Sequence, residues 1–126
     1  VSRGSGFAAS VESMSLPVHD GDHAPSAQVV RDLMWRHAGL LRSRGSLEGL
    51  VSRLTGWWAY LARKRSAVST DREFRGLSSL VTVSLLIARA ALRREESRGG
   101  HFRTDFPQRD DIHWQKHVSD VIGSRL

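Results

Sequence analysis

Apolar residues recur at three- and four-residue spacing through the segment that follows Pro25. This spacing is typical of an amphipathic helix with one buried stripe. Its members are Val30, Leu33, Met34, His37, Leu40 and Leu41. Ser26 is placed to cap the start, and the cations of "RSRG" suit the end, with Gly45 just beyond. We therefore predict a first helix from Ser26 to about Arg44.

A second stripe with the same spacing begins directly after Gly45. Its members are Leu47, Leu50, Val51, Leu54, Trp57, Trp58 and Leu61. Ser46 can cap this helix, and the cations at 63–65 close it. Because the connection to the first helix is very short, we expect the two to lie antiparallel as a hairpin.

The third predicted helix runs from about Asp71 to Glu96. Thr70 and Glu73 have the spacing of a capping box, in which each side chain accepts a hydrogen bond from an otherwise unpaired amide. The helix carries two apolar faces: Phe74, Leu77, Val81, Leu85, Ala88 and Leu92 on one, Leu80, Val83, Ile87 and Ala91 on the other. A helix so broadly apolar is expected to lie buried between others. Small residues let neighbours approach it closely: Ser78, Ser84, Ala88, Ala90 and Ala91.

The helical pattern stops after Glu96. Gly99 and Gly100 can adopt the left-handed geometry that ends a helix, and Phe106 is biased toward an extended conformation by Pro107. The fold class predicted is all-α. We expect a linker or mobile arm over 1–25, an up-down-up, spectrin-like three-helix bundle over 26–98, and an extended tail over 99–126. That tail has room for a short helix capped by Asp110 or Asp111.

The 126-residue chain carries a net charge of +6, from 19 Lys+Arg and 13 Asp+Glu. The arginines are scattered among acids, which favours an ion-paired surface over a nucleic-acid site, although a free-standing basic helical module that binds nucleic acid stays open as an alternative. The absence of cysteine excludes disulfides and thiolate metal sites, and we expect a cytoplasmic protein. The apolar run 77–92 is interrupted by polar residues, so we expect no membrane insertion.

Histidines and tryptophans are the remaining candidates for chemistry. His19 and His23, like His113 and His117, are four apart and could share a metal with nearby aspartates, but surface histidines explain them more simply. His37 on the first stripe is expected to be a hydrogen-bonded core or interface residue, and Trp57 and Trp58 to be packing residues. No nucleophile elbow, phosphate loop or dinucleotide fingerprint is present. We therefore assign no catalytic, cofactor-binding or metal-binding residue.

Charge is concentrated in "ALRREESRGGHFRTDFPQRDD", residues 91–111. Arginines and carboxylates at a helix end, followed by an extended segment that needs support, suit docking better than catalysis. We predict interdomain docking by seven residues: Arg94, Glu96, Ser97, Arg98, His101, Arg103 and Asp105.

This stretch, followed by "HWQKH", resembles the C-terminal helical domain of the fumarate reductase/succinate dehydrogenase flavoprotein family, which includes L-aspartate oxidase. The family carries ESRG-x-H-x-R-x-D-[FY]-P after an arginine at the end of a three-helix bundle. The matching residues are Arg93, Glu96, Ser97, Arg98, Gly99, Gly100, His101, Arg103, Asp105, Phe106 and Pro107. "LMWRHAGLLRSRGSLEGL" resembles the family's first bundle helix through Met34, Gly39, Leu40, Arg42 and Leu47. The resemblance covers about residues 26–117.

Within the family, "MWRHAGLLR" and "ESRGGHFRTDFP" look like the aspartate oxidases of bacteria, whereas the ending "RDD", tryptophan and "KH" looks like the succinate enzymes. The resemblance implies a longer enzyme that binds FAD in a separate Rossmann-like domain. It implies oxidation of L-aspartate to iminoaspartate for quinolinate and NAD synthesis, with succinate chemistry as the alternative. The implied partners are the upstream FAD-binding and capping domains, and a homo-oligomer is possible. No catalytic position of the family maps onto this chain, so we expect it to be inactive alone.

Overall fold

A computed structural model describes residues 23–65 and 71–119 of the chain. It contains four helices, α1 (Ala27–Ala38), α2 (Arg44–Lys64), α3 (Arg72–Arg93) and the single-turn α4 (Asp111–Trp114), and no strand within the described residues. The predicted all-α, three-helix architecture is confirmed. Residues 1–22 of the predicted arm and the tail beyond residue 119 lie outside the described residues.

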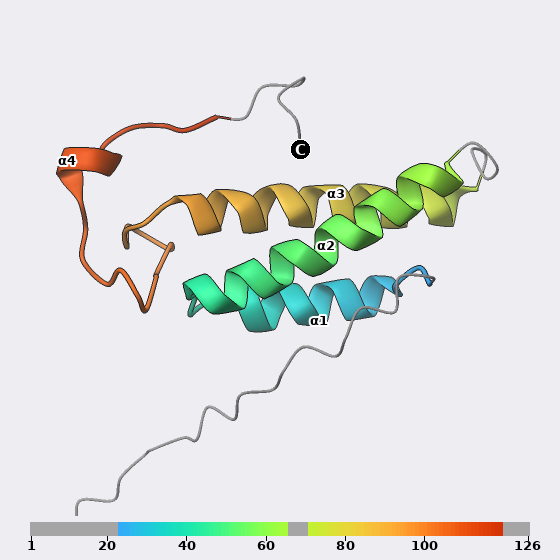
Figure 1. Cartoon of the computed structure of the whole chain (residues 1–126), viewed down its shortest axis with the longest axis horizontal. Helices are drawn as coiled ribbons and strands as arrows, with labels where there is room; N and C mark the ends of the chain where they lie inside the picture. The colour runs from blue at the N-terminus through green and yellow to red at the C-terminus, as the bar shows by residue number, and fades with distance from the viewer. Residues whose placement is uncertain (1–22, 66–70, 120–126) are drawn as a thin grey trace, which may run out of the picture.

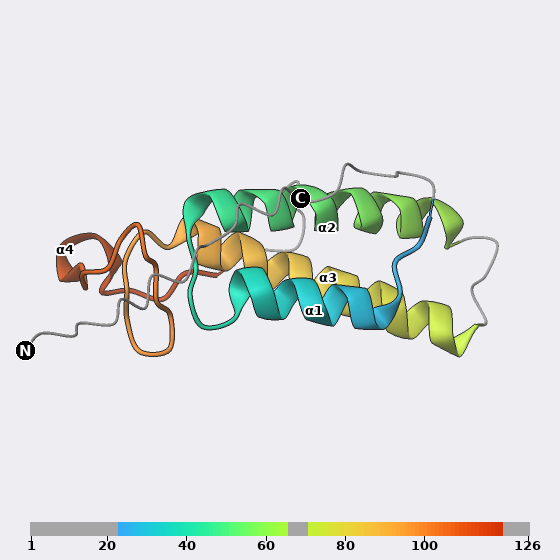
Figure 2. The ribbon, with the colours of Figure 1, turned by 90° about the horizontal axis from the view of Figure 1, so that it is seen from below.

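The three long helices run up, down and up. In Figure 1, α2 returns antiparallel to α1, and α3 runs back in the direction of α1. Figure 2 shows the same arrangement from below, with α1 lying across α3 and beside α2. All three pairs are in contact. Beyond Arg93 the chain loops past the end of the bundle, where α4 lies.

The core lies on the facing sides of the three long helices. Its fully buried members come from all three helices: Val30, Leu47, Leu50, Leu54, Val81 and Ala88. Trp57 is also buried and Trp58 packs against the core, as the spacing predicted. His37 Nδ1 lies 2.7 Å from the Ser46 hydroxyl oxygen and is partly buried, so the prediction of a hydrogen-bonded histidine is confirmed.

The end of the first helix differs from the prediction. α1 stops at Ala38, six residues before the expected Arg44, because Gly39 leaves the helical conformation. A Cβ on Gly39 would lie 2.2 Å from the Trp35 carbonyl oxygen, so only glycine fits there. Leu40 and Leu41, predicted to be on the buried stripe, instead lie exposed in the α1–α2 connection.

Two predicted caps also change. Ser43, not Ser46, caps α2 by accepting a hydrogen bond from the Ser46 amide. Asp71 caps α3 by accepting from the Glu73 amide at 2.9 Å, while Thr70 lies outside the described residues. α3 ends at Arg93 rather than Glu96, so the predicted role of the glycine pair in ending this helix was wrong.

The second apolar face of α3 is the largest departure from the expected burial. Of its four predicted members, Ala91 is buried and Leu80 packs against the core, whereas Val83 is 53% exposed and Ile87 is 46% exposed. The exposure arises because α1 and α2 together cover only one side of the helix. By length and composition, α3 is the one helix among the described residues that could cross a membrane, with a mean hydropathy of 1.4. The apolar segment of α3 is therefore longer and more apolar than the sequence analysis expected, but a helix in the core of a helical bundle can have the same length and hydropathy.

Candidate functional site

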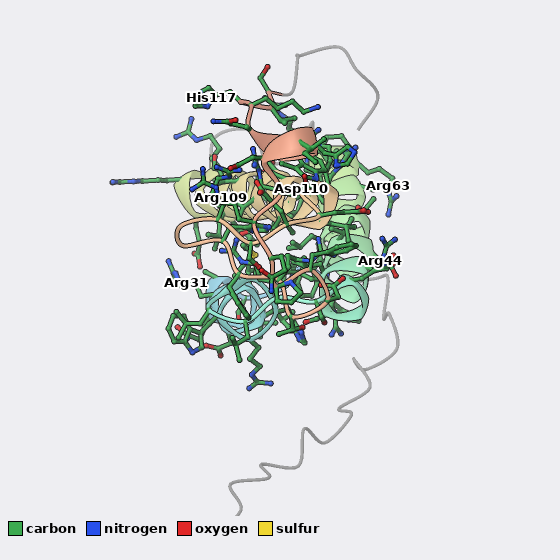
Figure 3. The ribbon with its side chains drawn as sticks, turned by 90° about the vertical axis from the view of Figure 1, so that its left-hand side faces the viewer. Arg31, Arg44, Arg63, Arg109, Asp110 and His117 are labelled. Atoms are coloured by element: carbon green, nitrogen blue, oxygen red, sulfur yellow. The ribbon has the colours of Figure 1, made fainter. Side chains whose placement is uncertain are left out.

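The segment after α3 folds into a polar cluster at one end of the bundle. We define the C-terminal polar cluster as residues 94–111 together with Arg42 and Arg44, which reach it from the α1–α2 connection and the start of α2. Figure 3 looks at this end, with Arg109 and Asp110 over the helices and Arg44 to one side. All seven predicted docking residues are brought together here.

Arg103 is the centre of the cluster and is fully buried. Its guanidinium donates to both carboxylate oxygens of Asp105, at 2.8 and 2.6 Å. It also donates to the carbonyls of Ala91, Leu92 and Arg94, at 2.9–3.2 Å. The last carbonyls of a helix lack intrahelical partners and carry partial negative charge, so a buried cation there satisfies both needs. Arg103 thus closes the C-terminus of α3.

Asp105 holds Arg103 in place and reaches the start of α2. Its carboxylate accepts a hydrogen bond from the Arg44 amide at 3.2 Å. The paired Arg103 guanidinium lowers the pKa of Asp105 to about 2, against the opposing effect of burial. The carboxylate is therefore ionised at neutral pH and links the end of α3 to the beginning of α2.

Glu96 is the second fully buried charge. Its carboxylate accepts hydrogen bonds from Arg98 at 3.0 and 3.2 Å, from Arg94, and from the Asp110 amide at 2.9 Å. The bonds from Arg98 contribute most to lowering the pKa of Glu96 to about 2, and burial opposes them. The same contact raises the pKa of Arg98, which also pairs with Asp111 at 2.6 Å. Glu96 therefore ties the end of α3 to the start of α4.

Ser97 and a tight turn determine the conformation of the loop between the two buried charges, Glu96 and Arg103. The Ser97 hydroxyl accepts from the Arg103 amide at 2.9 Å and lies 2.8 Å from the Phe106 carbonyl, to which it donates. Arg98 and His101 exchange two backbone hydrogen bonds around a turn in which Gly99 has φ +57°. A left-handed residue of this kind favours glycine, because a side chain would be strained.

His101 is held as a neutral imidazole. Its Nδ1 lies 2.7 Å from a terminal nitrogen of Arg42, which can only donate, so Nδ1 accepts and carries no proton. Its Nε2 therefore carries the proton and donates to the Arg94 carbonyl at 3.1 Å. Burial contributes most to lowering the pKa of His101, the hydrogen bond to the Arg94 carbonyl opposes it, and the cation of Arg42 lowers it further. Protonation would remove the acceptor that Arg42 uses.

The two arginines of the α1–α2 region are part of the cluster that sequence reasoning missed. Arg42 donates its amide to the Phe102 carbonyl, accepts from the Thr104 amide, and donates its side-chain Nε to the Ala38 carbonyl at 2.9 Å. Arg44 pairs with Glu95 at 2.9 Å. The match of Arg42 to the family pattern was the one signal available, since spacing along the chain cannot reveal a contact across 59 residues.

A hollow of about 450 Å³ opens beside the cluster and is lined mainly by basic groups and Trp114. Its lining comprises Arg94, Arg98, His101, Trp114, Gln115, Lys116 and His117. The Trp114 ring has the cations of Arg94 and Lys116 at 5.4 and 5.6 Å from its centre. Trp114, the last residue of α4, entered the sequence analysis only through the family resemblance, and it is the one apolar side chain among the described residues that line this hollow.

The side chains of the described residues do not form a metal centre. No group of three or more His, Asp or Glu side chains in 23–65 and 71–119 could hold a metal ion. α4 ends at Trp114, so His113 and His117 do not share a helix face, and His19 lies outside the described residues. The described part also lacks the strand that a dinucleotide-binding loop requires.

The cluster explains how the predicted docking residues are used within this chain. Every buried side-chain nitrogen and oxygen among the described residues has a hydrogen-bond partner. Arg103 and Glu96 face inward, whereas Arg94, Ser97, Arg98, His101 and Asp105 are partly exposed. Contact of these exposed edges with other domains stays a prediction.

Comparisons with known proteins match this chain to one family. The model of "Fumarate reductase flavoprotein C-term" matches residues 27–122. The L-aspartate oxidase of Streptomyces coelicolor is 36% identical over 75% of this chain, and a fumarate reductase (CoM/CoB) chain of Methanothermobacter marburgensis is 34% identical over 72%. A fumarate reductase flavoprotein from Mycobacterium tuberculosis is 58% identical over 33% of the chain.

The match is to one end of much longer proteins. This chain spans 17%, 18% and 7% of the lengths of those three relatives. No solved structure matches it. The matched region contains all three bundle helices and the polar cluster. The chain therefore belongs to the fumarate reductase flavoprotein family and carries the family's C-terminal helical domain.

Proposed function

We propose that this chain is the C-terminal helical domain of a cytoplasmic, FAD-dependent L-aspartate oxidase. The observation that carries the proposal is the alignment of three quarters of the chain with the L-aspartate oxidase of Streptomyces coelicolor. In such an enzyme FAD accepts the two electrons released when L-aspartate becomes iminoaspartate, which would supply quinolinate and NAD synthesis. The flavin and the catalytic groups belong to domains upstream, so this chain alone is expected to be inactive.

The role proposed for this domain is structural support of the flavin-binding and capping domains. The polar cluster ties the α1–α2 connection, the end of α3 and the start of α4 into one unit through Arg103, Glu96 and Arg42. Arg94, Arg98 and His101 line the basic hollow and are partly exposed. The basic lining of this hollow suits carboxylates of the upstream domains, and docking through these edges stays the role predicted from the sequence.

A fumarate reductase or succinate dehydrogenase flavoprotein is the second candidate. It is favoured by the 58% identity with the fumarate reductase flavoprotein of Mycobacterium tuberculosis over 42 residues. That match covers a third of this chain, and the fumarate reductase (CoM/CoB) chain of Methanothermobacter marburgensis aligns over 72% of it, close to the 75% of the L-aspartate oxidase of Streptomyces coelicolor. The resemblance of "MWRHAGLLR" and "ESRGGHFRTDFP" to the aspartate oxidases of bacteria is the reason for placing L-aspartate oxidase first.

The test uses the natural full-length chain that carries this sequence. Its flavin content is measured by absorbance after purification, and its turnover is measured with L-aspartate and succinate as alternative electron donors. We expect bound FAD and oxidation of L-aspartate. Turnover of succinate instead would keep the family and replace the proposed member, and a full-length chain without flavin would refute both candidates.

A further inference from the structure

The outer side of α3 is an apolar surface that no described part of the chain covers. α3 buries Val81, Leu85 and Ala88 against the other helices. At 100° per residue, Val83 and Ile87 lie on the opposite side of the helix, where they are 53% and 46% exposed. We define the outer face of α3 as the exposed residues on this side, Gly76, Ser79, Val83, Leu86, Ile87 and Ala90, since Leu80 at its edge packs against the core.

This face is continuous over several turns of one helix. Residues 76–88 contain no Asp, Glu, Lys or Arg, so nothing on this stretch of α3 keeps the outer side charged. Gly76, Ser79 and Ala90 are small and allow another backbone to approach closely. Other exposed apolar side chains lie elsewhere, such as Leu40 and Leu41 in a connection and Ile112 in α4. A contiguous apolar patch of this kind marks an interaction surface.

The ends of the face are basic. Arg72 and Arg75 lie at its N-terminal end, and Arg89 and Arg93 near its C-terminal end, while Glu73 is the one carboxylate on α3. A hollow of about 500 Å³ opens on the flank of the same helix, lined by Phe74, Val83 and neighbouring polar groups. An apolar surface with a cationic border is complementary to an apolar patch that is bordered by carboxylates.

We infer that the outer face of α3 is the surface on which the upstream flavin-binding part of the natural polypeptide packs, through an apolar patch rimmed by acidic side chains. This inference rests on the proposed function. We assign the upstream part of the same polypeptide as the partner because the relatives are several times longer than this chain and this domain lies at their C-terminal end. The upstream domains are tethered to this one, so their effective concentration at the face is high.

The polar cluster is a weaker candidate for the main contact. Its buried charges already have partners inside this chain, so docking there exchanges water for protein at partly exposed edges. The outer face of α3 has no such partner among the described residues, and covering it removes apolar side chains from water. The polar cluster can therefore orient the contact with the upstream domains, while burial of the outer face of α3 supplies most of the favourable free energy of that contact.

The test compares one double substitution in two settings. Val83→Glu/Ile87→Glu is made in this 126-residue chain and in the natural full-length flavoprotein. Glutamate is a good helix former, so we expect the melting temperature of the short chain to change by no more than about 2 °C. In the full-length protein we expect a fall of about 5 °C or more, with loss of bound flavin, because two carboxylates are buried at the interface.

Two further variants make the comparison specific. Leu40→Glu/Ile112→Glu also places two new charges at exposed apolar positions, but off the outer face, and is expected to leave both proteins unchanged. Val83→Thr/Ile87→Thr is a milder change at the same sites. If the glutamate variant of the short chain does not fold, the threonine variant gives the same contrast with a smaller shift.

Every other outcome contradicts the inference, and each points to a different explanation. A full-length variant that keeps its flavin and melting temperature shows that the face is not the docking surface, while the proposed function stands. A short chain that is dimeric by light scattering, and monomeric after substitution, assigns the face to a second copy. Binding of the short chain to phosphatidylcholine vesicles that depends on Val83 and Ile87 assigns it to lipid. A full-length protein without flavin refutes the proposed function, and its melting temperature still reports whether the face is covered.

Discussion

The polar cluster, which follows the C-terminus of α3, and the outer face of α3 have opposite relations to the rest of the chain. The cluster consists of charges, the groups most costly to bury, yet Arg103 and Glu96 are fully buried with all of their polar atoms paired. The outer face consists of side chains that favour burial, yet Val83 and Ile87 remain exposed. A high density of charge in a sequence therefore does not by itself identify a docking surface, because the charged side chains can pair with one another inside the chain.

The largest expected effect comes from breaking the cluster at its centre. Arg103→Met leaves the carboxylate of Asp105 and the last carbonyls of α3 without their donor. Removing one partner of a buried ion pair costs about 3–5 kcal/mol, so we expect a decrease of about 3 kcal/mol in the free energy of unfolding, measured by urea denaturation. Arg109→Met is the matched control, because Arg109 and its partner Asp111 are both largely exposed, and it should change the free energy of unfolding by less than about 0.5 kcal/mol. Equal effects of the two substitutions would contradict the central role of Arg103.

The second effect is a loss of stability in acid. The pKa values of Glu96 and Asp105 are both lowered to about 2 in the folded chain, from 4.5 and 3.8. The unfolded chain then binds more protons than the folded chain between these limits, so the stabilisation is complete above about pH 4.5 and is lost as the pH falls toward 2. Glu96→Gln should lower stability at pH 7 and flatten this dependence, as followed by urea denaturation across the range. Glu95→Gln, at an exposed neighbour, serves as the control; the same flattening there would contradict the assignment.

A smaller effect is expected near the pKa of histidine. Burial lowers the pKa of His101 and also that of His37 below 6.5. As the pH falls below 6.5 the unfolded chain takes up these protons first, so the folded chain loses stability progressively until the lowered pKa values are reached. His101→Gln should make the decline in melting temperature between pH 7 and 5.5 shallower than in the natural sequence. An unchanged slope would mean that Arg42 does not depend on the neutral imidazole.

The smallest effect is expected on the exposed face of the isolated chain. Ile87→Ser removes an apolar side chain that is almost half exposed, and should change the free energy of unfolding much less than Leu85→Ala on the buried side. We expect less than about 1 kcal/mol for the first and about 2–4 kcal/mol for the second, by urea denaturation. Equal costs would show that the two sides of α3 are similarly buried, and would remove the contrast on which the docking surface depends.

The sequence predicted the helices better than their ends. The three- and four-residue spacing located the core of α1, α2 and α3, because burial against neighbouring helices imposes that period. The spacing predicted too late an end for α1, because the close approach of Gly39 to the Trp35 carbonyl cannot be recognised from the spacing of apolar residues. It also chose Ser46 over Ser43 as the cap of α2, since two serines three apart fit the same rule.

The function of each surface was harder to predict for a physical reason. The apolar spacing placed Val83 and Ile87 on one face of α3 with Leu80 and Ala91, but spacing does not say which of these four residues is covered within the chain. The charged residues 94–105 were correctly grouped, yet their main partners include Arg42 and Arg44, which are far away in sequence. Only the folded chain brings these groups together and shows which of them are already paired.

The most direct measurement is the rate of thiol labelling at position 87. The chain contains no cysteine, so Ile87→Cys introduces one defined thiol here, and Leu40→Cys provides a control at an exposed position off the face. The maleimide reaction is followed for both variants in the 126-residue chain and in the full-length flavoprotein, with any upstream cysteines replaced. We predict that the thiol at position 87 reacts readily in the short chain and is protected in the full-length protein, while the thiol at position 40 reacts in both. Equal labelling of position 87 in the two proteins would contradict burial of the outer face of α3 by the upstream domains.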